Sequence, residues 1–182
     1  MFFGYSKYSS IMGLNLNKLK NLSRFLKNKD FVNSLIENVT AIYSLNLKGI
    51  KNSVILNYDS DLNDLSYWYQ QLVAESLGKK GKGVNPIISF GPKDHHSLLQ
   101  LYLDGPKDKF FTILNSQSVK SNIKIYNRFA PYDMEFLNNK NLKSIIDAQC
   151  YATKKIFKLK KIPLRTIIFN KKNEEELGKI FA

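Results

Sequence analysis

The feature that most constrains the fold is an alternation of short β-branched runs with longer segments of helical periodicity. Five runs are expected to be strands: residues 53–57, the apolar part of "NPIISFGPKD", 109–114, 122–127, and "PLRTIIF" at 163–169. Turn-forming residues flank each run, and helix-length segments separate most of them. Strands that alternate with helices at this spacing predict βαβ units. The expected fold is α/β, a three-layer, doubly wound, mostly parallel sheet.

The helical segments carry recognisable ends. Residues 14–47 predict two helices, the second with Asp30 as its cap and with Phe31, Leu35, Val39 and Ile42 on its apolar face. Four further helices are expected. The first ends at Gly78, the second is capped by Asp94 and closed by Gly105, the third covers 141–157, and the last is capped by Asn173. The apolar stripe of the first consists of Leu62, Leu65, Trp68, Tyr69, Leu72, Val73 and Leu77.

Length and composition favour one domain with its own core, because 182 residues suffice for a sizeable buried interior. No apolar run reaches the roughly 18 residues that a membrane span requires, and the first residues lack the pattern of a secretory leader. We therefore expect a cytoplasmic protein with no membrane partner. Cys150 is the single cysteine, which excludes a disulfide framework, and we expect it to be a small core residue.

The net charge of +13 raises the question of nucleic-acid binding. Arginine, the usual residue for bidentate phosphate and base contacts, occurs only at Arg24, Arg128 and Arg165. The lysines are scattered over most segments and form no stripe interleaved with aromatic residues. The sequence therefore predicts no nucleic-acid partner.

Glu75 is the first candidate for chemistry, because it lies in the last turn of an aromatic-rich helix. The negative end of the helix dipole, together with partial burial, would raise the pKa of this carboxyl toward that of a general base. The alternative is an exposed glutamate that pairs with Lys79 four residues later.

The second candidate is Asp94-His95-His96-Ser97, which follows a predicted strand and a Gly-Pro turn. An imidazole near a helix N-terminus stays neutral near pH 7 and is able to move protons. A metal site is disfavoured, because adjacent helical residues point about 100° apart and no third ligand has a characteristic spacing. A capped pair of surface histidines remains the alternative.

The third candidate is the run "GKKGKG", in which backbone N–H groups and lysines would cradle a phosphate. Its first residues, Gly78 and Lys79, are the expected substrate-binding positions. The run matches neither the P-loop nor the dinucleotide-binding fingerprint, so a solvated loop is the alternative.

Taken together, "YWYQQLVAESLGKKGKGVNPIISFGPKDHHSLLQLYLDGPKDKFFTIL" resembles the glucose-6-phosphate isomerase family. The similarity continues through "IDAQCYATKKIF", "IPLRTIIF" and "NEEELGKIF". It covers roughly residues 50–182, and residues 12–50 match more loosely. The resemblance implies that the chain is part of a single sugar-isomerase (SIS-type, flavodoxin-like) domain over 1–182, with 1–50 as its N-terminal helical segment.

The resemblance also implies an activity, the interconversion of glucose 6-phosphate and fructose 6-phosphate through a cis-enediol, without metal or organic cofactor. Glu75 matches the family's base, and His96 matches its ring-opening histidine, which in the family reaches into the site of a partner subunit. A homodimer is therefore implied. His95 stands where the family commonly has glutamine.

Several family motifs are missing from this sequence. The Gly-Gly-Arg-aromatic-Ser run, the Ser/Thr/Lys phosphate-binding segment, and the terminal Gln and Lys have no counterpart here. We therefore expect a fragment with little or no turnover on its own. The alternative is a non-catalytic module that binds sugar phosphates.

Overall fold

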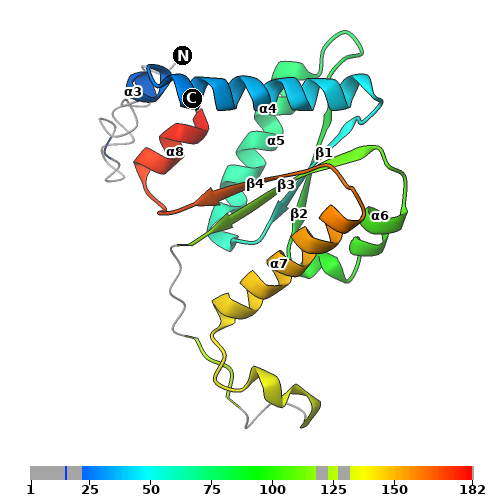
Figure 1. Ribbon diagram of the computed structural model, residues 1–182, viewed down its shortest axis with the longest axis vertical. Coiled ribbons are helices and arrows are strands. Elements are labelled where there is room, and N and C mark those ends of the chain that lie inside the picture. The colour runs from blue at the N-terminus through cyan, green and yellow to red at the C-terminus, as the bar shows by residue number, and fades with distance from the viewer. Residues whose placement is uncertain (1–14, 16–21, 118–122, 127–131, 182) are drawn as a thin grey trace.

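The protein is built around a four-stranded parallel sheet with the strand order β2-β1-β3-β4 (Figure 1). The computed structural model describes residue 15 and residues 22–117, 123–126 and 132–181. The strands are β1 (Asn52–Asn57), β2 (Asn85–Phe90), β3 (Lys109–Ser116) and β4 (Leu164–Phe169). The doubly wound parallel α/β architecture expected from the sequence is confirmed.

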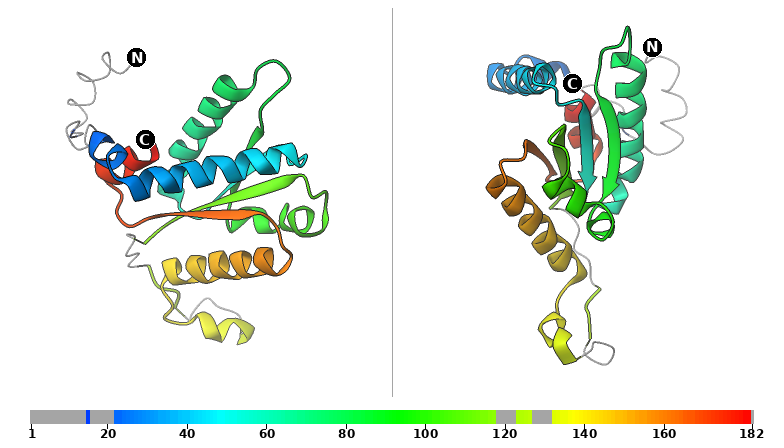
Figure 2. Two further views of the ribbon diagram at one scale, coloured as in Figure 1. Left: turned by 45° about the horizontal axis from the view of Figure 1, so that its top comes forward. Right: turned by 90° about the vertical axis from the view of Figure 1, so that its right-hand side faces the viewer.

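Helices cover both faces of the sheet (Figures 1 and 2). The α-helices are α3 (Leu22–Leu26), α4 (Lys29–Leu47), α5 (Asn63–Leu77), α6 (Leu99–Asp104), α7 (Leu142–Leu159) and α8 (Glu174–Phe181), and the 3-10 helices are η1 (Ser60–Leu62), η2 (Lys93–His95) and η4 (Tyr132–Leu137). Within the described ranges, no helix is long and apolar enough to cross a membrane.

The core is divided by the sheet, because neighbouring residues of a strand face opposite sides. Val54 in β1 packs on one side with Tyr102 of α6 and Phe157 of α7. Ile55, the next residue, packs on the other side in a cluster that α5 and α8 complete. Cys150 of α7 is 1% exposed and lies in the core, as expected, and burial raises the pKa of its thiol.

Helix α4 lacks fully buried residues, and its apolar surface is wider than predicted. Phe31, Leu35 and Ile42 are half-buried, as the predicted core-facing stripe requires. Val39 was expected on the same face but is 67% exposed. It belongs to a second stripe along one side of the helix, which consists of Ile36, Val39, Tyr43 and Leu47.

Two predictions for these elements are wrong, and part of a third lies outside the described residues. Asn28 caps α4 in place of Asp30, and its side chain accepts hydrogen bonds from the amides of Asp30 and Phe31. The described part of the expected strand at 122–127 forms a single antiparallel bridge, between Lys124 and Asn141, and no strand. Residues 16–21 of the first predicted helix lie outside the described residues.

Asp59, two residues after β1, ties together three segments at the carboxyl edge of the sheet. Its side chain is 5% exposed and accepts hydrogen bonds from Ser116 at the end of β3, from Lys172 after β4 (2.8 Å), and from the amide of Asp61 (3.0 Å). Burial pushes the pKa of this carboxyl upward, but these hydrogen bonds and the charge of Lys172 outweigh burial and lower it. Asp59 is therefore held as a carboxylate.

We expect Asp59→Asn to lower the free energy of unfolding at pH 7 by about 2 kcal/mol, because it removes charge-assisted hydrogen bonds from a buried site. A lowered folded-state pKa stabilises the fold above the unfolded-state value of about 3.9, and this contribution disappears as the pH falls through the folded-state pKa. Urea titrations at pH 7 and at pH 3 should therefore show the difference between wild type and variant shrinking in acid.

Asp61→Asn is the matched control for this variant. Asp61 contacts the same lysine at 2.5 Å, but its side chain is 66% exposed. The control should cost less than about 1 kcal/mol. A loss in the Asp61 variant as large as that in the Asp59 variant would contradict the central role of Asp59.

Candidate functional site

The chain reverses its winding direction between β1 and β3. The loops that follow these two strands lie at the carboxyl edge of the sheet. From β1 the chain continues to β2 on one side, and from β2 it crosses back to β3 on the other. In open parallel sheets, the place between the loops that follow the two strands where the winding reverses is the usual location of ligand sites. Tyr58 and Asp59 follow β1 here, and the turn with the two histidines follows β2.

His95 is tied into this edge by hydrogen bonds to the residue after β1 and to α7. Its Nε2 lies 2.6 Å from the hydroxyl oxygen of Tyr58 and 3.3 Å from that of Thr153. Burial lowers the pKa of His95, the nearby His96 lowers it further, and Asp94 opposes both effects. The expectation that a histidine of this turn is held neutral is met at His95 by burial, and not by a helix N-terminus.

Asp94 does not cap a helix as predicted. Its Oδ2 accepts hydrogen bonds from the amide of Phe90 (2.7 Å) and from the hydroxyl of Ser89 (2.9 Å), so the carboxylate fastens the turn to the end of β2. The segment that follows is a 3-10 turn at 93–95, and α6 begins only at Leu99. His96 lies between the two helices and is exposed.

Glu75 lies in the last turn of α5, but it is exposed and lacks the partial burial that was expected. Its Oε1 accepts a hydrogen bond from Gln71 at 2.9 Å. The alternative partner, Lys79, forms no ion pair with Glu75 in the part of the chain that the structure describes. The carboxylate is therefore open to an incoming group.

The "GKKGKG" loop directly follows Glu75. Gly78 ends α5, as predicted, by donating its amide to the carbonyl of Ala74 (3.2 Å). The amide of Lys79 donates to the carbonyl of Leu77 (2.9 Å). Because both amides are engaged within the loop, a phosphate could meet only the exposed Lys79 ammonium at these two positions.

The structure does not bring Glu75 and His96 together within one chain. The end of α5 and its loop lie at the amino edge of the sheet, and the histidine turn lies at the carboxyl edge (Figure 2). The six residues of β2 separate the two edges by roughly 17 Å at about 3.3 Å per residue. A common site for both residues therefore requires a second polypeptide.

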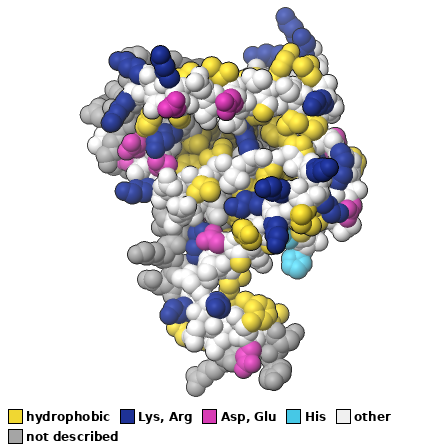
Figure 3. All heavy atoms as spheres, viewed as in Figure 1, with side chains coloured by type: hydrophobic (Ala, Val, Ile, Leu, Met, Phe, Trp, Pro, Cys, Tyr) yellow, Lys and Arg dark blue, Asp and Glu magenta, His cyan; other side chains and the backbone are white. Residues whose placement is uncertain are grey.

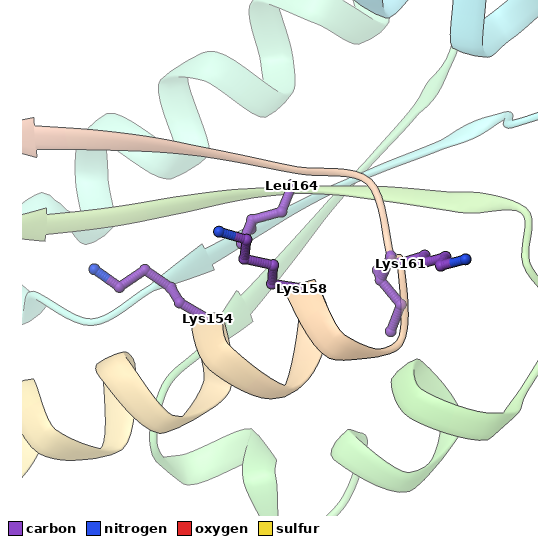
Figure 4. A pocket seen from close by; sticks show the side chains of 5 residues that line it. Lys154, Lys158, Lys161 and Leu164 are labelled. Atoms are coloured by element: carbon purple, nitrogen blue, oxygen red, sulfur yellow. The ribbon is translucent and has the colours of Figure 1, made fainter.

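A pocket of about 490 Å³ lies elsewhere, lined by Lys154, Lys158, Lys161, Ile162 and Leu164 (Figure 4). The ammonium group of Lys161 points away from those of Lys154 and Lys158, so the three charges do not converge on one ligand. Lysines near the end of α7 also offset the negative end of its dipole. The pocket contains none of the predicted site residues.

Positive charge is spread over the surface shown in Figure 3, with lysines and arginines between apolar and uncharged side chains. This distribution agrees with the scatter seen along the sequence. Among the described residues, no three His, Cys, Asp or Glu side chains are grouped so that they could hold a metal ion.

Tyr58 and Thr153 were missed by the sequence analysis. Tyr58 could have been found by its position directly after a predicted buried strand, where ligand sites of parallel sheets occur. Thr153 lies on α7 and is 3% exposed. Sequence periodicity gave no sign that its hydroxyl faces β1.

The fold and the edge residues define a class, a doubly wound α/β domain with flavodoxin-type strand order and a histidine-bearing loop beside its switch point. Solved structures agree on the fold. A crystal structure of a hypothetical protein from Thermus thermophilus matches with a TM-score of 0.75 at 22% identity, over 92% of this chain and 42% of that one.

Sequence comparison gives the family. The chain is 34% identical over 163 residues to a probable glucose-6-phosphate isomerase of Methanococcus maripaludis, which covers 89% of this chain and 36% of the relative. It is 31% identical over 176 residues to the glucose-6-phosphate isomerase of Methanocaldococcus jannaschii, which covers 92% of this chain and 42% of the relative. No family model matches the sequence.

The chain belongs to the glucose-6-phosphate isomerase family, and it spans about two fifths of the length of these relatives.

Gly83→Ala is expected to disturb the loop after Glu75. Gly83 has a φ of +116°, and a Cβ atom there would lie 2.7 Å from the carbonyl oxygen of Leu77, so the backbone has to shift. We expect a loss of about 2 kcal/mol in the free energy of unfolding. Thermal denaturation monitored by circular dichroism measures it.

Gly81→Ala is the matched control in the same loop. Gly81 also has a positive φ, +70°, but its Cβ would meet nothing within 4 Å. It should cost about 1 kcal/mol. Equal losses in the two variants would show that the contact with Leu77 does not constrain the loop.

Proposed function

We propose that this chain is part of a sugar-isomerase domain of a cytoplasmic glucose-6-phosphate isomerase, with Glu75 and His96 as catalytic residues. The observation that carries the proposal is identity to isomerases of 31–34% across about nine tenths of the chain. The exposed positions of both side chains support it, because a substrate and a second subunit must reach them. The substrate would be a hexose phosphate.

The proposed chemistry needs one base and one proton carrier. The Glu75 carboxylate takes the proton from C2 of the open-chain aldose while the C1 carbonyl oxygen accepts a proton, which gives the cis-enediol. The proton then returns from Glu75 to C1 as the C2 hydroxyl loses its proton and becomes the carbonyl of the ketose. His96 moves the proton that opens the sugar ring. Lys79 lies four residues beyond Glu75 and supplies positive charge near the phosphorylated substrate.

The proposed active form is a homodimer in which Glu75 of one copy faces His96 of the other. The separation of the two residues across the sheet supports this arrangement, since one copy alone places them at opposite edges, which the length of β2 holds roughly 17 Å apart. The exposed stripe Ile36, Val39, Tyr43 and Leu47 on α4 adds apolar surface that solvated proteins usually cover. Asn46 connects the end of this helix to the Glu75 loop through a hydrogen bond to Gly83 (3.2 Å).

The test is an isomerase assay coupled to glucose-6-phosphate oxidation, run on this chain and on the longest reading frame that contains it. We expect the longer protein to convert fructose 6-phosphate and this chain alone to show little turnover. Glu75→Gln in the longer protein should lower kcat at least about 100-fold, because it removes the base. The control is Glu37→Gln, which changes an exposed glutamate on α4. It should leave kcat within about twofold of wild type.

Two results would contradict the proposal. Turnover that survives Glu75→Gln would show that another group is the base. A longer protein that binds fructose 6-phosphate calorimetrically without converting it would instead identify a non-catalytic sugar-phosphate-binding module.

A further inference from the structure

Tyr58 is the centre of a contact set that the proposed chemistry does not use. It follows β1 directly, is 3% exposed, and donates its backbone amide to the carbonyl of Leu114 (2.9 Å). Its ring lies against the start of the histidine turn, because a Cβ on Gly91 would come within 2.6 Å of it. The Gly91 amide also donates to the carbonyl of Asn57 at 2.8 Å.

The hydrogen bonds around Tyr58 have one consistent direction. The Thr153 hydroxyl donates to the backbone carbonyl of Gln149 (3.0 Å), which can only accept. The Tyr58 hydroxyl donates to Thr153 (2.8 Å), and burial raises the pKa of Tyr58, which keeps that proton in place. The only role left for His95 Nε2, at 2.6 Å from Tyr58, is that of an N–H donor.

The turn at 91–98 is therefore fastened at three points. Gly91 packs on the Tyr58 ring, Asp94 holds the end of β2 through Phe90 and Ser89, and His95 donates to Tyr58 from the far side of the turn. The imidazole and phenol rings meet edge to face, with their centroids 5.7 Å apart. His96 is the next residue, and it is exposed.

We propose that His95 is a positioning residue: its Nε2–H donation to Tyr58 holds the turn at 91–98 in one conformation and so fixes the direction in which His96 projects. The contacts within the turn stand by themselves, and their functional meaning rests on the proposed role of His96. A buried hydrogen-bonded side chain on one residue and an exposed imidazole on the next give the turn one anchored and one free ring.

The surroundings of His95 also keep a second positive charge away from His96. The groups that face it are Tyr58 from the segment after β1, Thr153 from α7, and Asp94 and His96 from its own turn. Because burial lowers the pKa of His95, its ring stays neutral as a donor.

The test is NMR on the whole 182-residue chain. Ring ¹⁵N shifts should show His95 protonated at Nε2 and bare at Nδ1, a signature that packing alone does not set. Amide exchange is then followed at His96 and Leu98, whose amides donate to Lys93 and Asp94 within the turn (3.4 and 2.8 Å). The Tyr58 amide, which donates to the carbonyl of Leu114 in β3, is the internal reference.

His95→Ala should speed exchange at Leu98 about threefold to tenfold relative to Tyr58, because one hydrogen bond that closes the turn is lost. In His95→Gln, exchange at Leu98 should stay within about twofold of wild type, since the glutamine amide can donate to Tyr58. Thr153→Val keeps the side-chain volume but removes the hydroxyl that accepts from Tyr58, at the other end of this series of hydrogen bonds. It should also speed exchange at Leu98.

An Nδ1–H tautomer at His95 would overturn the proposal, and so would unchanged exchange at Leu98 in both His95→Ala and Thr153→Val. None of these measurements depends on turnover. A failed isomerase assay with an intact exchange pattern would therefore reject the role of His96 alone, and the reverse result would reject the positioning role alone.

Discussion

The rest of the structure depends on a buried carboxylate at the carboxyl edge of the sheet. The loops that follow parallel strands all leave from the same edge of the sheet, and loops lack the internal hydrogen bonds that hold helices and strands together. Asp59 meets Ser116, Lys172 and the Asp61 amide at this edge, so one charged group joins the ends of β1 and β3 to the segment after β4. Tyr58 beside it connects to α7 and the histidine turn. These two residues determine where the loops that carry candidate chemistry can lie.

The same topology explains why one copy of the chain holds only halves of the proposed site. A helix between two parallel strands must return to the opposite edge, so Glu75 at the end of α5 lies far from His96 after β2. No side-chain rearrangement removes a separation set by the length of β2. In the proposed dimer, each copy offers Glu75 at one edge and His96 at the other.

The sequence was sufficient for the architecture, because the alternation of strand and helix patterns depends on local periodicity. Periodicity was less informative for exposed apolar faces. Leu62, Leu65 and Val73 of the predicted stripe turn toward the core, but Trp68, Leu72 and Leu77 are 39%, 44% and 55% exposed. Apolar character alone cannot distinguish a face that meets the sheet from one that another surface covers. The hydrogen bonds of His95 were equally out of reach, because they join residues 37 and 58 positions apart.

The most direct test of the account is complementation between two inactive variants of the longer protein, Glu75→Gln and His96→Asn. If the site is shared between copies, hybrids formed by mixing and reassembly carry one intact site, and activity should return to roughly a quarter of wild type by random pairing. Activity in the mixture no higher than in either variant alone would contradict a shared site and would require Glu75 and His96 to act within one chain or not at all.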